Sequence, residues 1–154
     1  MRIERAAWSD LPEVLRLVER LLDELHDDEE FGGLDRHRTL GDLEREGNRF
    51  VALIARQDDR EAAGVLTLTE TFAIYAGGRY GVIDELYVAP AHRSTGVGRL
   101  LLDAAASIGR ERGWRRIDVT APPGERWRRT VAFYEKNGFV FTGPKLRRSL
   151  ADGI

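Results

Sequence analysis

The segment from Glu85 to Ala105 places the strongest constraint on the fold. Its sequence, ELYVAPAHRSTGVGRLLLDAA, begins as an apolar strand, breaks at Pro90, passes two glycines and continues with the apolar periodicity of a helix. A strand that turns directly into a helix is typical of α/β proteins. The glycine-containing turn also exposes backbone N–H groups at the positive end of the helix, where an anion such as phosphate can bind. A tight turn that only caps the helix remains the alternative.

The remaining chain has the periodicities of a mixed α/β sheet. We expect helices at residues 11–25, 36–46, 96–112 and 126–137. We expect strands at residues 2–6, 49–57, 62–75, 81–88, 114–121, 138–143 and 144–150. This order predicts antiparallel pairs early in the chain, a strand-helix-strand crossover in the middle and helices on both faces of the sheet. Gly64, inside one expected strand, suggests a bulge or a close backbone contact.

Length and charge narrow the class of protein. A chain of 154 residues with 42% hydrophobic content favours a single domain, 1–154, with a sizeable core. Because 24 Lys and Arg stand against 26 Asp and Glu, neither nucleic acid nor an anionic membrane is expected as a partner. The chain has no apolar run of signal-peptide or membrane-span length, so we expect a soluble, cytoplasmic protein.

The residue types exclude several chemistries. The chain has no cysteine, which rules out a cysteine nucleophile, disulfides and thiolate metal ligands. Its three histidines are far apart in the sequence and lack the spacing of metal ligands, so no metal site is expected. A P-loop requires Lys and then Ser or Thr after its glycines, whereas Arg99 and Leu100 follow here. The third glycine of a dinucleotide fingerprint is also missing. A different phosphate-bearing ligand is therefore expected.

Two motifs resemble the GNAT superfamily of acetyl-CoA-dependent N-acetyltransferases. The first is ELYVAPAHRSTGVG with the helix after it, which is similar to the family's acyl-CoA-binding pattern of Arg or Gln, two residues, Gly, one residue, and Gly or Ala. The second is AFYEKNGF, at the end of the next expected helix. The resemblance covers essentially the whole chain. It implies a mostly antiparallel α/β sheet with helices on both faces and splayed central strands. It also implies acetyl transfer from acetyl-CoA to a primary amine of a small molecule or peptide.

The resemblance assigns the cofactor-binding residues. Backbone groups of Leu86, Tyr87 and Val88 would pair with the pantetheine arm like a missing strand. Arg93 opens the acyl-CoA motif. The pyrophosphate would be held by the backbone N–H groups of the residues that follow, which are Ser94, Thr95, Gly96, Val97, Gly98 and Arg99.

The resemblance also implies the catalytic groups. Tyr134 would lie near the thioester sulfur and protonate the departing thiolate, for which a phenol with a pKa near ~10 is suitable. Asp84 is the preferred acceptor of the amine proton, Glu85 is the second candidate and Asp118 the third. Neighbouring residues on a strand point to opposite faces, so we expect that only one of Asp84 and Glu85 faces the substrate. Two alternatives remain: the carboxylate on this strand forms a structural ion pair, and Tyr134 only packs in the core.

The sequence departs from the family pattern at Trp127. Trp127 stands where many members have Asn, which puts that cofactor contact and the substrate wall in doubt. The acidic stretch 26–30 would attract a cationic amine or is simply a solvated loop.

A non-catalytic acyl-CoA-binding module is the second hypothesis for the function, and the presence of Tyr134 favours the enzyme. The acceptor amine cannot be named from the sequence, and a homodimer remains open.

Overall fold

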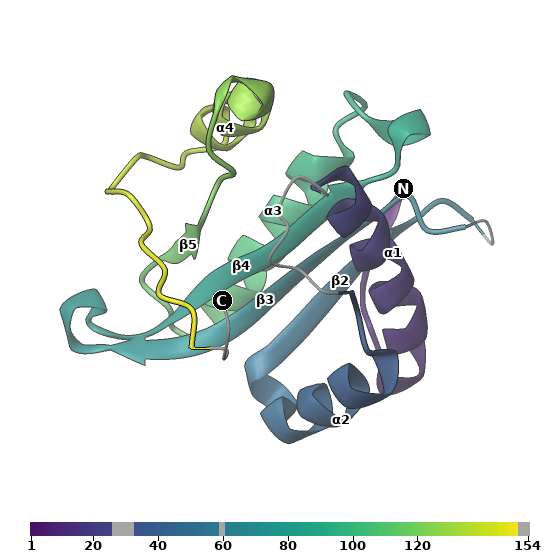
Figure 1. Cartoon of the computed structure of the whole chain (residues 1–154), viewed down its shortest axis with the longest axis horizontal. Helices are drawn as coiled ribbons and strands as arrows, with labels where there is room; N and C mark the ends of the chain where they lie inside the picture. The colour runs from purple at the N-terminus through teal and green to yellow at the C-terminus, as the bar shows by residue number, and fades with distance from the viewer. Residues whose placement is uncertain (26–32, 59–60, 151–154) are drawn as a thin grey trace. The chain divides into compact units, whose positions relative to one another are not determined.

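The structure is a computed structural model of the chain that describes residues 1–25, 33–58 and 61–150 (Figure 1). The acidic stretch 26–30 lies outside the described residues. The chain divides into two compact units, Met1–Val119 and Thr120–Ile154. The helices and strands are β1 (Arg2–Arg5), α1 (Leu11–Glu24), α2 (Arg36–Glu46), β2 (Phe50–Arg56), β3 (Gly64–Ala73), β4 (Gly78–Val88), α3 (Val97–Glu111), β5 (Ile117–Val119) and α4 (Arg128–Lys136).

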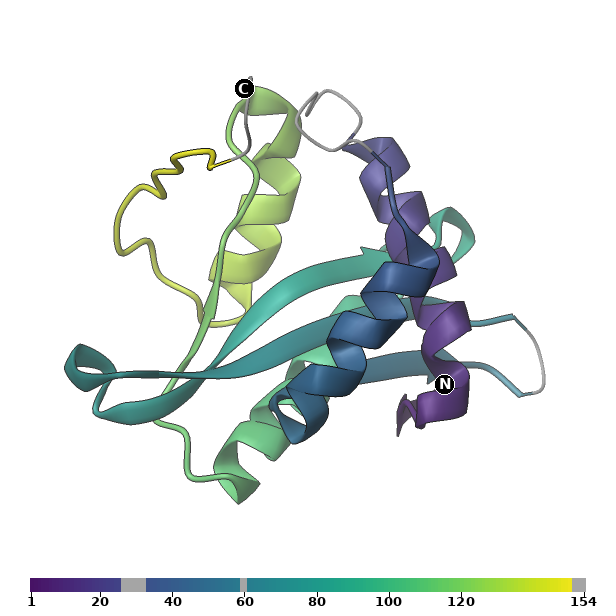
Figure 2. The same ribbon diagram turned by 60° about the horizontal axis from the view of Figure 1, so that its bottom comes forward.

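The first unit contains one sheet with the strand order β1-β2-β3-β4-β5. The first four strands pair antiparallel, and β5 pairs parallel to β4 after the crossover through α3. The hairpin of β3 and β4 is the longest pair and extends past the end of β2, as Figure 2 shows. The expected mixed, mostly antiparallel sheet is therefore confirmed.

Successive side chains of each strand point to opposite faces of the sheet, so the core consists of two layers, each covered by helices. Ala52 and Ile54 on β2 pack with α1, and partly buried leucines of α2 pack against the same cluster. The residues between them face the opposite layer, where Leu101 of α3 lies under Gly64. In Figure 2, α1 and α2 accordingly cover one face of the sheet and α3 the other. An amphipathic helix buries its apolar stripe in this way, which explains the three- and four-residue spacing of leucines in α1.

Gly64 occupies a close backbone contact, one of the two roles expected for it. A Cβ atom at this position would lie 2.7 Å from the carbonyl oxygen of Tyr87 on β4. The bulge lies elsewhere, between Thr67 and Leu68 of β3, where Glu85 and Ile83 are the partners. The extra residue on β4 is Asp84.

Gly64→Ala is expected to lower the free energy of unfolding by about 1–3 kcal/mol, because the new methyl group meets backbone that must shift. Gly41→Ala is the matched control, since a Cβ at this α2 position meets nothing within 4 Å. It should raise the free energy of unfolding by up to about 1 kcal/mol, through better helix propensity. Urea denaturation measures both. Equal stabilities of the two variants would contradict the close contact.

The second unit contains α4, which ends with Gly138 just beyond it. The expected strands 138–143 and 144–150 are wrong, because the described residues there form no strand. Most of their apolar side chains are exposed, as at Phe141 and Leu146. Pro144, at the start of the second segment, also has no N–H to donate to a neighbouring strand.

Strand β5 is shorter than the sequence predicts. Strand β5 has three residues, not the eight of the expected strand 114–121, because pairing with β4 stops after Val119. The side chain of Trp114 is buried against Gly81 and Gly109 and does not belong to the strand. Among the described residues, no helix has both the length and the apolar character needed to cross a membrane.

Candidate functional site

The C-terminal half of β4 separates from its parallel neighbour. Strand β4 pairs with β5 only from Gly81 to Ile83. Among the described residues, no strand pairs with Asp84–Val88 on that side, so backbone groups along this edge are open to a ligand, except the Val88 carbonyl oxygen, which accepts a hydrogen bond from Arg93. Leu86, Tyr87 and Val88 lie on this splayed part of β4, where the resemblance predicted pairing with an extended ligand.

The turn between β4 and α3 contains residues with positive φ. A short 3-10 helix, Pro90–His92, leads into it, and Ser94 and Gly96 have φ values of 61° and 90°. Gly96 is the N-cap of α3 and has no side chain with which to cap the helix. The first N–H groups of a helix have no acceptor within it, and its dipole favours negative charge there. The turn and the first turn of α3 can therefore bind an anionic group.

Arg93 is part of the turn's own structure. Its Nε atom donates to the carbonyl oxygen of Val88 at 2.8 Å, and its Nη2 atom lies 2.5 Å from the Glu24 carboxylate on α1. Its guanidinium also lies 5.7 Å from the centre of the Tyr87 ring. Arg93 thus fastens the turn to the end of β4. Arg99, the third residue of α3, is exposed, and its Nε atom lies 3.9 Å from Asp103 Oδ2.

The bulge in β4 changes where the two adjacent carboxylates point. Thr67 and Thr69 are two residues apart on β3 and so share a face. The Thr69 hydroxyl donates to Asp84 Oδ2 at 2.7 Å, and the Thr67 hydroxyl donates to the Glu85 carboxylate. Both carboxylates therefore lie on one face, the face covered by α1 and α2. The expectation that they point to opposite faces is wrong, because the bulge interrupts alternation at Asp84.

The two carboxylates have different surroundings. Burial raises the pKa of Glu85 above its usual value; the charge of Asp84 raises it further, and the hydrogen bond from Thr67 opposes the shift. The Thr67 hydroxyl is fully buried and also accepts the Glu85 N–H at 3.1 Å. Asp84 is exposed. A carboxylate with a raised pKa is the better proton acceptor near neutral pH, so the geometry favours Glu85 over Asp84.

Thr67 is a site residue that the sequence reasoning missed. The signal for it was present, because Thr67 and Thr69 are polar residues on one face of the otherwise apolar run VLTLT. A buried hydroxyl on such a face needs a hydrogen-bond partner, and here the partner is the Glu85 carboxylate.

Asp118 lies on the same face as the two carboxylates. It pairs with Val82 across β4 and β5, and Val82 pairs with Thr69 across β3 and β4. The Arg116 Nη2 atom is 3.2 Å from Asp118 Oδ2, so the third candidate base carries an ion pair of its own.

Tyr134 belongs to the second unit. Its ring packs against those of Phe133 and Phe139, with centres 5.4 and 5.5 Å away. Burial raises the pKa of Tyr134 to about 12, above the value near 10 that the sequence argument used. The phenol therefore stays protonated at any ordinary assay pH and is a weaker acid than expected. Its position beside a thioester remains a prediction.

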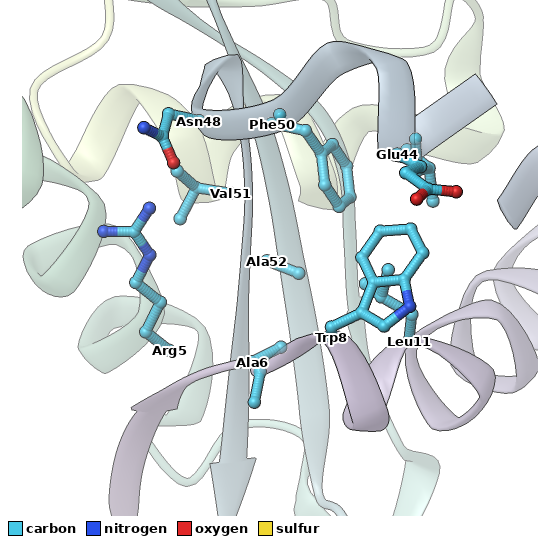
Figure 3. Close-up of a pocket in the computed structure, with 12 residues that line it drawn as sticks. Arg5, Ala6, Trp8, Leu11, Glu44, Asn48, Phe50, Val51 and Ala52 are labelled. Atoms are coloured by element: carbon cyan, nitrogen blue, oxygen red, sulfur yellow. The ribbon is translucent and has the colours of Figure 1, made fainter. Parts of the chain in front are cut away.

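A hollow of about 290 Å³ lies in the first unit, between β1, the start of β2 and the end of α2. Figure 3 shows Trp8 and Phe50 on one side of it, with Glu44 beside the indole, and Arg5 and Asn48 on the other. None of the predicted site residues lines this hollow. Within the first unit, the predicted cofactor residues and the carboxylates Asp84 and Glu85 lie instead on β4, in the turn after it and at the start of α3.

The chain matches known acetyltransferases along most of its length. The sequence pattern of the Acetyltransferase (GNAT) family matches residues 12–139. Streptothricin acetyltransferase of Streptomyces lavendulae is 31% identical over 117 residues, which make up 73% of this chain and 54% of that protein. The chain thus spans about half the length of this curated relative.

Solved structures share the fold. An aminoglycoside acetyltransferase from an uncultured soil metagenomic sample superimposes with a TM-score of 0.80 at 22% identity, covering 97% of this chain and 98% of that one. A ribosomal-protein-alanine N-acetyltransferase from Brucella melitensis biovar Abortus 2308 gives 0.74 at 21% identity, covering 96% and 100%. At these identities the likeness concerns the fold alone. Since the family match includes the splayed end of β4, the glycine turn and α3, the chain belongs to the acetyltransferase (GNAT) family.

Proposed function

We propose that this protein is an N-acetyltransferase that transfers the acetyl group of acetyl-CoA directly to a primary amine. The observation that carries the proposal is the splayed end of β4, which leads through the Gly96 turn into the uncapped start of α3. An open strand edge beside an anion site suits a ligand with an amide-containing arm and a pyrophosphate.

The residues present fit acetyl-CoA. Backbone groups of Leu86, Tyr87 and Val88 would pair with the pantetheine arm, and the N–H groups from Ser94 to Arg99 would hold the pyrophosphate. A Cβ at Gly96 would meet nothing within 4 Å, so the described residues leave open space beside this residue. Acetyl-CoA supplies an acetyl group activated as a thioester.

Glu85 takes the role of proton acceptor in this proposal. Its raised pKa comes from burial, and the Thr67 hydroxyl holds its carboxylate in place. The incoming amine must lose a proton as it attacks the acetyl carbonyl, and Glu85 receives that proton directly or through water. Asp84, one residue away and exposed, adjusts the pKa of Glu85. The chain has no cysteine to carry an acetyl intermediate, so a ternary complex is expected rather than ping-pong kinetics.

The acceptor is proposed from the relatives' names and from the charge of the site. Asp84, Glu85 and Asp118 on one face favour a cationic amine. Relatives are named for acetylating streptothricin, aminoglycosides and a ribosomal-protein alanine. Amine-bearing antibiotics are therefore the first acceptors to test, followed by peptide N-termini.

A panel of amines tests the proposal. Streptothricin, aminoglycosides, polyamines, amino acids and peptides with a free N-terminus would each be incubated with acetyl-CoA, and thiol release and the acetylated product measured. Saturation by one amine with intersecting initial-rate lines is expected. Failure of every amine, with acetyl-CoA binding intact, would favour the non-catalytic acyl-CoA-binding module.

Tyr134→Phe is expected to lower kcat by about 10²-fold, the low end for one general acid. The substitution keeps the ring that packs on Phe133 and Phe139 and removes only the proton that would pass to the departing thiolate. Acetyl-CoA affinity should hardly change. Single-turnover measurements isolate the chemical step, and a wild-type rate in that step would exclude Tyr134 as the acid. Phe133→Leu, which alters the neighbouring ring alone, is the packing control.

A further inference from the structure

A pair of tyrosines and an aspartate hold an arginine on the same face as Glu85. The guanidinium carbon of Arg116 lies 4.9 Å from the centre of the Tyr75 ring and 4.9 Å from that of the Tyr80 ring. Its Nη2 atom is 3.2 Å from Asp118 Oδ2. A cation within about 6 Å of an aromatic centroid is attracted to the ring face, so this cluster is a cation receptor occupied by a side chain of the protein itself.

The other three residues of this cluster, Tyr75, Tyr80 and Asp118, are positioned by contacts that do not involve Arg116. Tyr80 is buried on β4, and Asp118 is held on β5 by pairing with Val82. The Tyr75 and Tyr80 phenols share a hydrogen bond, which contributes to a raised pKa of Tyr80. The two rings and the carboxylate come from the β3–β4 connection, β4 and β5, so the sheet itself brings them together.

Arg116 is poorly satisfied in this position. Its Nε atom is buried and has no hydrogen-bond partner among the described residues. A buried donor without a partner is unfavourable, and a rival cation that avoids this loss can compete with it. The way in is open, because the side chains of Arg116 and Asp118 are 38% and 45% exposed and Tyr75 is 78% exposed.

We propose that Tyr75, Tyr80 and Asp118 form a second cation subsite for the acceptor, which Arg116 occupies until a cationic substrate group displaces it. This inference rests on the proposed function, because it assigns the subsite to the amine acceptor. The occupant is an alkylammonium or guanidinium group, whose charge suits both the two ring faces and the carboxylate.

The position of the subsite sets the length of the preferred substrate. Asp118 lies one strand from β4, and Glu85 lies three residues beyond the Val82 that pairs with it. Because of the bulge, Val82 and Glu85 face Thr69 and Thr67, so only about two strand steps separate them. With about 3.3 Å per residue and about 4.8 Å between strands, Asp118 and Glu85 are roughly 8 Å apart at the backbone. A flexible diamine that is slightly longer than this when fully extended reaches both, with one amine at Glu85 and the other between the tyrosines.

Calorimetry with diaminooctane tests the subsite without acetyl transfer. Arg116→Ala should bind diaminooctane about 10-fold more tightly than the wild type, because the internal competitor is gone. Arg115→Ala removes the same charge from an exposed neighbour and should change the affinity less than 2-fold by comparison, as expected for a surface charge. Octylamine, with a single amine, should gain less than diaminooctane from Arg116→Ala.

A double variant separates the subsite from a general effect. Adding Tyr75→Leu to Arg116→Ala should remove most of the gain, since the exposed ring supplies one of the two faces. Arg116→Ala binding no more tightly than Arg115→Ala, in a protein with unchanged circular dichroism, would overturn the proposal.

Kinetics distinguish failure of the subsite from failure of the proposed function. In Arg116→Ala the KM for diaminooctane should fall about 10-fold relative to Arg115→Ala, in line with the binding gain. Tighter binding with an unchanged KM would overturn the assignment to the acceptor. If no amine is acetylated, the proposed function fails, while the calorimetric result still decides whether the cation site exists.

Discussion

Glu85→Gln is expected to lower kcat/KM for the best acceptor by about 10³-fold, within the range for removal of a positioned general base. The amide fills the same space and still accepts the Thr67 hydrogen bond, so the fold should be retained. Because the amide cannot take a proton, the loss should be largest above the pKa of Glu85 and should shrink at lower pH, where the wild-type carboxyl group is itself protonated. Steady-state kinetics over the pH range of a stable fold measures it.

The pH dependence has a predicted direction in two further variants. A base works only when deprotonated, so activity falls as the pH drops through the pKa of Glu85. Asp84→Asn removes a charge that raises this pKa, and the acid limb should move to lower pH. Thr67→Val removes a hydrogen bond that lowers the pKa, and the limb should move to higher pH.

These opposite shifts identify Glu85 among the three carboxylates. If Asp84 were the base, Asp84→Asn would abolish the acid limb along with most of the activity, and Thr67→Val would leave the limb in place. Likewise, if Asp118 were the base, Asp118→Asn would abolish the acid limb along with most of the activity. An unchanged rate in Glu85→Gln would exclude Glu85 from proton transfer.

Gly98→Asp is expected to weaken acetyl-CoA binding by about 10³-fold, since like charges placed together cost several kcal/mol. Gly98 is the second residue of α3, next to the N–H groups that would hold the pyrophosphate. An acidic residue in the first turn favours the helix itself, because it complements the dipole. Loss of binding would therefore not reflect loss of the helix.

Gly98→Ala is the matched control for this substitution. It adds the Cβ without the charge and should keep most of the affinity if repulsion is the cause. Calorimetry with CoA and acetyl-CoA compares the two variants. Wild-type affinity in Gly98→Asp would remove the start of α3 from the cofactor site, and equal losses in both variants would replace repulsion with a steric cause.

Local patterns of the sequence were sufficient for the parts of the site that are continuous in the chain. The strand, the glycine turn and the helix between Glu85 and Ala105 lie in the structure where they were expected. Each depends on neighbouring residues only, through periodicity, the break at Pro90 and the backbone freedom of Gly96. The family motif adds to these local signals because it lies within the same continuous segment.

The pairing of β3 with β4 determines where the Asp84 and Glu85 side chains point, which the sequence pattern does not predict. Alternation predicts that Asp84 and Glu85 point to opposite faces, but the bulge opposite Thr67 and Leu68 places both on one face. A bulge belongs to the register of two strands, and no signal within β4 alone specifies it.

The same reason explains the other differences between expectation and structure. Arg116 lies between Tyr75 and Tyr80 because β5 returns beside β4 after the α3 crossover, a contact between residues distant in the chain. The apolar run from Phe139 to Thr142 has the composition of a strand but forms none, since a strand exists only with a partner to pair with. The sequence by itself determined the four helices, the first strands and the glycine turn, whereas tertiary pairing determined where the later strands form and which side chains meet, because register and partner choice depend on residues far apart in the chain.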